Sequence, residues 1–161
     1  MLRLLTADLQ LDSVLELDAT RVHALGLDAL LLDVDCTLKN YRAEDVGEDV
    51  AAWLGSLRAA GIGLCLVSNG RNRRIMEFAQ RRQLPFVAKA LKPLPFGCRA
   101  AVRKLSLDPR RTAMVGDQVF ADVVAGRLAG LFCILVKPIR PEEEPWYTRL
   151  KRLFEKPFRR R

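Results

Sequence analysis

Short apolar runs alternate with longer segments of helical spacing along most of this chain. Each apolar run predicts a buried strand, and each segment with apolar residues three and four positions apart predicts a helix. The predicted strands cover residues 29–32, 62–67, 85–88, 112–115 and 131–136, and the predicted helices cover residues 46–60, 72–83, 95–105 and 119–129. Because such alternation forms parallel sheets with right-handed crossovers, the pattern predicts an α/β fold, a Rossmann-like three-layer sandwich with a five-stranded parallel sheet.

The N-terminal part of the chain precedes this alternation. Residues 1–27 are typical of an N-terminal extension, in which Asp18 caps a short helix over residues 19–25 and Gly26 ends it. His23, the single histidine, lies in that helix. We predict that His23 faces solvent and has no catalytic role.

The C-terminal end differs from the rest in charge and in aromatic content. The protein carries a net charge of +8, and the last 25 residues hold nine basic and four acidic residues, a net of +5. Residues 138–161 are therefore predicted to form a basic, aromatic tail, mostly helical, after a domain of residues 1–137. Acidic residues 142–144, followed by Pro145, suit the start of that helix, because they complement its dipole.

The overall composition limits the classes of protein to consider. A chain of 161 residues, half of them hydrophobic, suffices for one folded domain. The four cysteines are dispersed, which favours free thiols in a reducing compartment. No apolar run is long enough to span a bilayer, and Asp8 interrupts any signal-peptide core. We expect a cytoplasmic protein, with a polyanionic substrate or partner suggested by the charge.

Polar residues follow three of the predicted strands. Asp33, Asp35 and Thr37 follow the first strand, Ser68 and Asn69 the second, and Gly116 and Asp117 the fourth, with Asp122 one helical turn beyond. Because the carboxyl ends of parallel strands share one edge of a sheet, these side chains are expected to meet there. Several carboxylates in one place repel each other unless a hard cation binds among them, and Mg²⁺ is the natural choice.

Phosphoryl transfer is the chemistry that this set of groups suits best. Asp33 would act as nucleophile and metal ligand, and Asp35 as general acid and then base. Ser68 would supply a hydroxyl, and Lys92 a positive charge to balance the nucleophile and the phosphate. Taken singly, each feature also has an ordinary explanation: an acidic turn, a Ser-Asn-Gly turn, a Lys-Pro loop or an Asp-capped helix. Their order, each at or just beyond a strand end, favours the functional interpretation.

Four sequence motifs resemble those of the haloacid dehalogenase superfamily of phosphatases, class IIIA. The motifs are Asp33-Val34-Asp35-Cys36-Thr37-Leu38, Ser68-Asn69, Lys92-Pro93 and Gly116-Asp117-Gln118-Val119-Phe120-Ala121-Asp122. More narrowly, they resemble the YqeG subgroup, which is similar to mitochondrial phosphatidylglycerophosphate phosphatases, although Cys36 stands where that subgroup often has Asn.

The resemblance implies a role for each matching residue. The catalytic residues would be Asp33, Asp35, Lys92 and Ser68, and the phosphate would be bound by Thr37, Ser68, Asn69 and Lys92. The resemblance also implies that Mg²⁺ is held by Asp33, Asp35 through its backbone carbonyl, Asp117 and, in support, Asp122. The substrate expected on this ground is phosphatidylglycerophosphate.

The spacing of the motifs leaves no room for a cap domain. Asp35 and Ser68 are 33 residues apart, and Ser68 and Lys92 are 24 apart, distances that one helix and one strand already fill. The resemblance therefore implies a capless, open site that can meet a phosphate on a large body or a membrane. The tail, residues 146–161, would bind an anionic membrane surface or pack its aromatic side chains on the domain.

Two other functions stay open at this point. One is a phosphatase for soluble nucleotides, sugar phosphates or nucleic-acid 3′-phosphate ends, although no aromatic platform near the motifs supports binding to nucleic acid. The other is a non-catalytic binding protein that uses the basic tail. The intact set of Asp33, Asp35, Lys92 and Asp117 argues against that second alternative.

Overall fold

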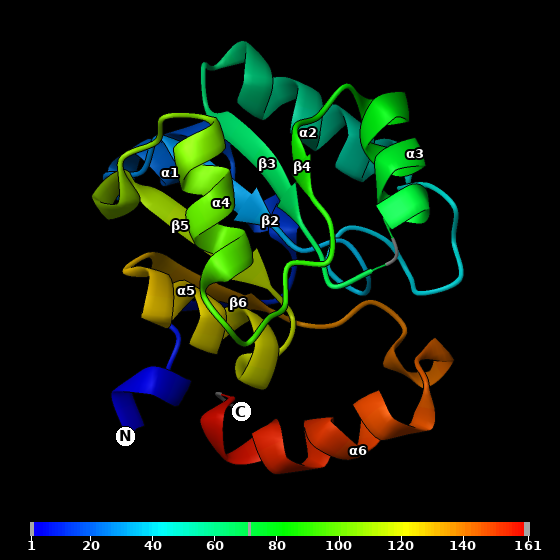
Figure 1. The fold of residues 1–161 in the computed structure, drawn as a ribbon. Coiled ribbons are helices and arrows are strands. Elements are labelled where there is room, and N and C mark those ends of the chain that lie inside the picture. The colour runs from blue at the N-terminus through cyan, green and yellow to red at the C-terminus, as the bar shows by residue number, and fades with distance from the viewer. Residues whose placement is uncertain (1, 71, 160–161) are drawn as a thin grey trace.

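A computed structural model describes residues 2–70 and 72–159 of the protein. Its centre is a parallel sheet of six strands in the order β1-β6-β5-β2-β3-β4, with helices on both sides (Figure 1). The strands are β1 (Leu9–Leu11), β2 (Ala29–Leu32), β3 (Gly63–Val67), β4 (Phe86–Val87), β5 (Thr112–Gly116) and β6 (Phe132–Val136). The helices are α1 (Ala19–Ala24), α2 (Glu48–Ala59), α3 (Asn72–Arg82), α4 (Phe96–Lys104), α5 (Val124–Ala129) and α6 (Trp146–Glu155).

The α/β sandwich is confirmed, but the predicted number of strands is wrong. The sixth strand is β1, which lies in the segment predicted to be an extension and pairs with β6, Leu9 opposite Ile134. It is only three residues long and half-buried at the edge of the sheet, so its sequence carries too little apolar pattern to indicate a strand.

Alternate residues of the central strands enter different cores. Leu30 and Leu32 of β2 pack in a core with α1, α2 and α3, while Leu31 packs with α4 and α5 on the other face. Since neighbouring side chains of a strand point to opposite faces, a strand covered on both sides must be apolar throughout. The uninterrupted apolar sequence of β2 reflects this position at the centre of the sheet.

The three central strands end at the same level. Leu32 is in register with Leu66 of β3 and with Val115 of β5. The chain crosses from β2 to β3 on one face of the sheet and returns from β4 to β5 on the other, which makes the end of β2 the switch point of the fold. Residues just beyond these three strands therefore share one crevice.

The N-terminal segment is tied to the body by its caps and by one buried hydrogen bond. Asp18 caps α1 by accepting a hydrogen bond from the Arg21 amide, 2.7 Å away, and His23 is exposed, both as predicted. Trp53 of α2 donates its indole N–H to the carbonyl of Leu17, with 2.7 Å between nitrogen and oxygen. Both residues are buried, so this bond replaces the water that each group loses on folding.

The C-terminal segment begins differently from the prediction. Residues 142–144 do not form the first turn of α6, because Pro141–Glu143 form a separate 3-10 turn and Glu144 is extended. Pro145 explains this, since a residue that precedes proline is held out of the helical region. Arg160 and Arg161, which belong to the predicted basic tail, lie outside the described residues. Within the described ranges, no helix is both long and apolar enough to cross a bilayer.

The hydrogen bond from Trp53 to Leu17 gives a stability prediction. Trp53→Phe keeps an aromatic ring but leaves the buried Leu17 carbonyl without its donor, which should cost about 1–3 kcal/mol of unfolding free energy. Urea denaturation followed by far-UV circular dichroism measures this cost. Trp146→Phe makes the same chemical change at an exposed site and should shift stability by less than about 0.5 kcal/mol. Equal effects of the two variants would contradict the proposed anchoring.

Candidate active site

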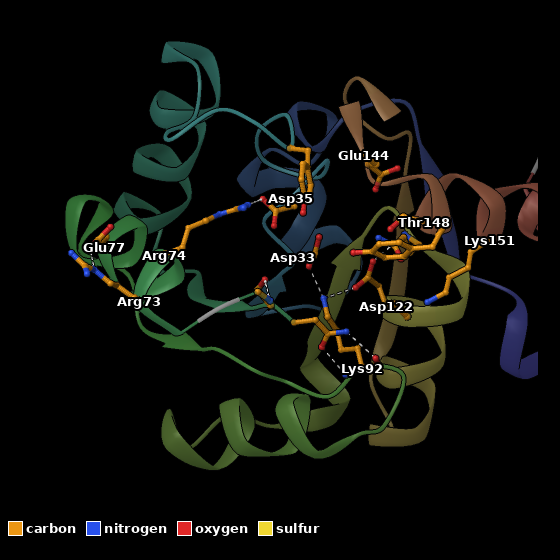
Figure 2. Close-up of a pocket in the computed structure, with 17 residues that line it drawn as sticks. Asp33, Asp35, Arg73, Arg74, Glu77, Lys92, Asp122, Glu144, Thr148 and Lys151 are labelled. Carbon is orange, nitrogen blue, oxygen red and sulfur yellow. Dashed lines mark hydrogen bonds and ion pairs between the residues drawn. The ribbon is translucent and has the colours of Figure 1, made fainter. Parts of the chain in front are cut away.

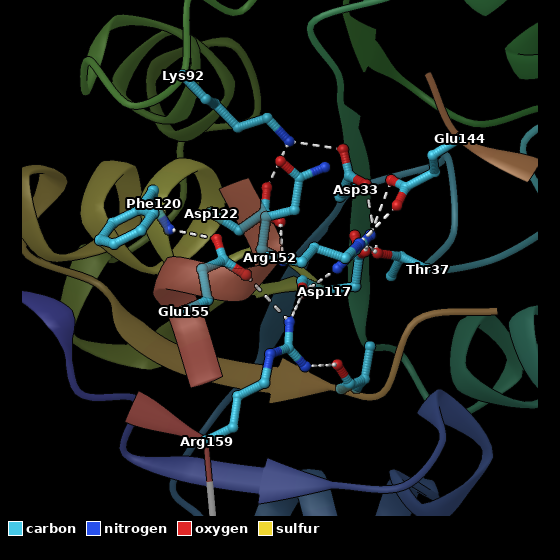
Figure 3. A network of polar contacts seen from close by, with 12 residues as sticks. Asp33, Thr37, Lys92, Asp117, Phe120, Asp122, Glu144, Arg152, Glu155 and Arg159 are labelled. Carbon is cyan, nitrogen blue, oxygen red and sulfur yellow. Dashed lines mark hydrogen bonds and ion pairs between the residues drawn. The ribbon is translucent and has the colours of Figure 1, made fainter. Parts of the chain in front are cut away.

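Carboxylates from two strand ends and the following turn meet in a buried cluster. Asp33 follows β2, Asp117 follows β5, and Asp122 lies in the π-helical turn Val119–Val123. One carboxylate oxygen of each lies within 4.8 Å of one from each of the others, and all three residues are buried (Figure 3). The structure thus brings together three of the acids that the sequence placed at one edge of the sheet.

Lys92 holds two of these carboxylates together. Its Nζ lies 2.6 Å from Asp33 Oδ1 and 2.6 Å from Asp122 Oδ1, and it donates a third bond to the Val67 carbonyl at 2.9 Å. Asn69 makes two hydrogen bonds to the backbone of Lys92. Its side-chain nitrogen donates to the Lys92 carbonyl, and its side-chain oxygen accepts from the Lys92 amide. All three donor positions of this buried ammonium group are therefore used.

Thr37 bridges two of the acids, and Gly116 leaves space for the third. The Thr37 hydroxyl lies 3.0 Å from Asp117 Oδ1 and 3.2 Å from Asp33 Oδ2, between the two carboxylates. A Cβ at position 116 would stand 2.2 Å from the Asp122 carboxyl group, so only glycine leaves space for that side chain. Thr37 was predicted to bind phosphate, and that role stays a prediction, because the described contacts direct its hydroxyl to the carboxylates.

The electrostatics of the cluster favour an additional cation. Burial raises the pKa of Asp33 to about 8, and although Lys92 opposes this shift, Asp122 and Asp117 add to it. Burial also raises the pKa of Asp117 to about 6, against the lowering effect of Arg152. Burial alone would lower the pKa of Lys92, but its two carboxylate partners outweigh this effect and raise it. When ionised, the acids outnumber the cations beside them, and clustered carboxylate oxygens are the donors that Mg²⁺ prefers, so the donor set fits a divalent ion.

A pocket of about 790 Å³ opens beside the cluster (Figure 2). Of the residues predicted to be functional, Asp33, Asp35, Ser68, Asn69, Lys92 and Asp122 line it. Ser68 accepts a hydrogen bond from the Gly70 amide at 3.0 Å, which leaves the proton of its hydroxyl available to a ligand. Acidic groups and neutral hydrogen-bond donors therefore line the same pocket.

Asp35 lies in this pocket but apart from the acidic cluster. Lys39 donates to Asp35 Oδ1 at 3.0 Å, and Arg74 of α3 pairs with the same oxygen. Among the described residues, Asp35 is not one of the three acids whose carboxylate oxygens lie close together. Its predicted role as a metal ligand concerns its backbone carbonyl, so that role stays a prediction. Neither Lys39 nor Arg74 was singled out by sequence reasoning, since neither belongs to a motif.

Arg152 of α6 is a further residue of the site that was not predicted from the sequence. Its guanidinium pairs with Asp117 Oδ2 and with Glu144, whose carboxylate oxygens lie 2.5 Å and 2.8 Å away, and it donates to the Asp117 carbonyl at 3.2 Å (Figure 3). Arg152 was counted only as part of the basic tail. One signal was present in the sequence: Thr148, Arg152 and Glu155 are spaced four and three residues apart and form a polar stripe along one face of α6.

Cys36 has a backbone conformation that suits the Asn that the resembling subgroup often has at this position. Its φ angle is 62°, in the left-handed region where Asn is better tolerated than most residues. Its side chain is buried, and burial raises the pKa of the thiol. The residue is therefore packed as a neutral group beside the site.

Comparison with known proteins defines the class of this protein. Residues 5–130 match the model of the haloacid dehalogenase-like hydrolase family, and the chain belongs to that family. It is similar to the probable phosphatase YqeG of Bacillus subtilis (strain 168), with 26% identity over 144 residues, 89% of this chain and 83% of that protein.

Solved structures support the fold. The cobalt-bound deoxy-D-mannose-octulosonate 8-phosphate phosphatase YrbI of Haemophilus influenzae superimposes with a TM-score of 0.58 at 14% identity, covering 79% of this chain and 75% of that one. An uncharacterized protein of Listeria monocytogenes serotype 4b gives a TM-score of 0.58 at 16% identity, covering 74% of this chain and 85% of that one. At these identities the likeness concerns the arrangement of the elements alone.

The position of Lys92 between two buried acids gives a second stability prediction. Lys92→Met retains the aliphatic stem but removes the charge, so Asp33 and Asp122 lose their shared partner at a cost of about 3–5 kcal/mol. The same substitution at exposed Lys89 is the control and should cost less than about 0.5 kcal/mol. Urea unfolding of both variants tests this difference. A Lys92→Met protein as stable as the parent would show that the cluster does not depend on the ammonium group.

Proposed function

We propose that this hydrolase is a phosphomonoester phosphatase that works through an aspartyl-phosphate on Asp33. The observation that carries the proposal is the position of Lys92 Nζ, 2.6 Å from Asp33 and 2.6 Å from Asp122, in the lining of an open pocket. An ammonium group beside the nucleophile balances the charge of an arriving phosphate as well as that of the carboxylate. The similarity to a probable phosphatase supports the same conclusion.

The proposed reaction has two steps. A carboxylate oxygen of Asp33 attacks phosphorus, the bond from phosphorus to the ester oxygen breaks, and Asp35 gives that oxygen its proton. Asp35 then takes a proton from water, whose oxygen attacks the aspartyl-phosphate, so that inorganic phosphate leaves and Asp33 is regenerated. Since Lys39 and Arg74 both pair with Oδ1 of Asp35, Oδ2 is the oxygen that would carry this proton.

Mg²⁺ is the cofactor that we propose for this site. Asp33, Asp117 and Asp122 would hold it, supported by the closeness of their oxygens, and Asp35 would add its backbone carbonyl, as the family resemblance implies. When bound, the ion neutralises charge on the phosphoryl oxygens. Ser68 and Asn69, at the side of the pocket, would bind those oxygens together with Lys92.

For the substrate we propose phosphatidylglycerophosphate, met by a cytoplasmic protein at the membrane surface. Three features support a large, surface-borne phosphate: the resemblance to the phosphatidylglycerophosphate phosphatases, the net charge of +8, and the absence of an inserted cap among residues 2–70 and 72–159. The pocket is instead bordered on one side by Tyr147, Thr148 and Lys151 of α6.

Removal of the nucleophile is the first test of this function. Asp33→Asn should lower kcat for a chromogenic phosphate ester by at least about 10³-fold, because an amide cannot form the acyl-phosphate. The circular dichroism spectrum should stay that of the parent. Asp28→Asn, an exposed aspartate just before the same strand, is the matched control and should retain activity. Phosphate release by Asp33→Asn at the parental rate would overturn the assignment of the nucleophile.

A comparison of substrates tests the finer proposal. We expect kcat/KM for phosphatidylglycerophosphate to exceed that for a nucleoside monophosphate, a sugar phosphate and an oligonucleotide 3′-phosphate by at least about tenfold. All activity should disappear with a chelator and return with Mg²⁺, because three buried carboxylates would otherwise face the phosphate. Preference for a soluble ester would replace the lipid proposal, and no hydrolysis of any ester would favour a non-catalytic binding protein.

A further inference from the structure

Helix α6 has its apolar side chains on the outside. Its outward side chains include Trp146, Phe154 and Leu153, which are 74%, 66% and 54% exposed. Its inward stripe is polar, with Glu155 buried and Arg152 nearly so. A helix on a globular domain normally turns its apolar face to the core, so this orientation is the reverse of the usual one.

Buried polar contacts hold α6 in this orientation. Arg152 pairs with Asp117 and Glu144, while Glu155 accepts a hydrogen bond from the Phe120 amide at 2.9 Å (Figure 3). Beyond the helix, Arg159 donates to the Asp117 carbonyl and pairs with Glu155 at 3.3 Å. A rotation that buried the aromatic face would break these contacts and leave charged groups without partners, so the outward face stays outward.

We propose that the outward face of α6, in its folded position, docks on an anionic lipid bilayer. This inference rests on the proposed function and names the surface through which the substrate is met. Arg149, Lys151 and Lys156 are exposed on the same segment and suit anionic headgroups, while the aromatic and aliphatic side chains suit the interfacial region. Insertion of the apolar side chains and attraction of the basic side chains to anionic lipids both strengthen peripheral membrane binding.

The position of α6 beside the pocket gives docking a consequence for substrate entry. Tyr147, Thr148 and Lys151 line the pocket from the helix that carries the docking face (Figure 2). Docking with α6 in place puts this wall of the pocket at the level of the headgroups. A phosphomonoester on a lipid then reaches Asp33 along α6 while its acyl chains remain in the bilayer.

Vesicle binding can be measured without any catalytic turnover. Trp146 is exposed and Trp53 is buried, so an emission blue-shift on adding vesicles reports on α6. We expect the shift, and co-sedimentation, with vesicles of phosphatidylcholine mixed with phosphatidylglycerol, in the parent and in Asp33→Asn. Vesicles of phosphatidylcholine alone should give neither, and high salt should weaken both effects, because salt screens the basic residues. No shift with the mixed vesicles would overturn the inference.

A matched pair of double variants locates the docking face. Leu153→Ser with Phe154→Ser removes two outward side chains of α6 and should weaken binding to the mixed vesicles by at least about tenfold. Leu94→Ser with Phe96→Ser removes an exposed leucine and an exposed phenylalanine elsewhere and should leave vesicle binding as in the parent. Equal losses in both pairs, or none in the α6 pair, would overturn the assignment of the surface.

Catalytic measurements separate this inference from the proposed function. The α6 pair should lower the ratio of vesicle-borne to soluble ester turnover by at least about tenfold, because only the former needs docking. Vesicle binding without hydrolysis of any ester supports the docking face and overturns the proposed function. Hydrolysis without vesicle binding overturns the docking face, as does a dimer that the α6 pair converts to monomers, since a second copy would then cover that helix.

Discussion

The cost of burying several carboxylates at one edge of a sheet governs much of this structure. Asp33, Asp117 and Asp122 are held within a few ångströms of each other and away from water, where like charges repel strongly. Lys92 and Arg152 compensate that charge from distant parts of the chain, Lys92 from the loop after β4 and Arg152 from α6 near the C-terminus. The cluster therefore connects the loop after β4 and helix α6 to the ends of the central strands.

The sequence predicted the sandwich because its central strands are buried on both faces. Such strands must be apolar at every position, and the runs at β2, β3, β5 and β6 are recognisable for that reason. The edge strand β1 lacks this constraint, since pairing with β6 through backbone hydrogen bonds needs no particular side chain. The other edge strand, β4, does carry an apolar run and was predicted, so an edge strand is missed where, as in β1, its side chains show little pattern.

Strand order made some of the site residues predictable and others not. Parallel strands in register bring their ends together, so residues after β2, β3 and β5 were predictable as neighbours from strand order alone. Arg74 and Arg152 reach Asp35 and Asp117 from helices 39 and 35 residues away along the chain. The local sequence does not distinguish Arg74 from the other basic residues on the surface, and the polar stripe of α6 that contains Arg152 does not name its partner. Each pairing depends on how two elements pack.

The inverted orientation of α6 follows from the acidic cluster. If Asp117 were apolar, a buried Arg152 would lack this ionic partner. Burial of the aromatic face would then be favoured, because it removes apolar surface from water. Because Asp117 is buried and charged, a cationic partner stabilises it more than apolar contact could, and the helix turns its polar stripe inward. The aromatic face is then left to solvent, which makes an exposed apolar surface a direct consequence of the charge at the site.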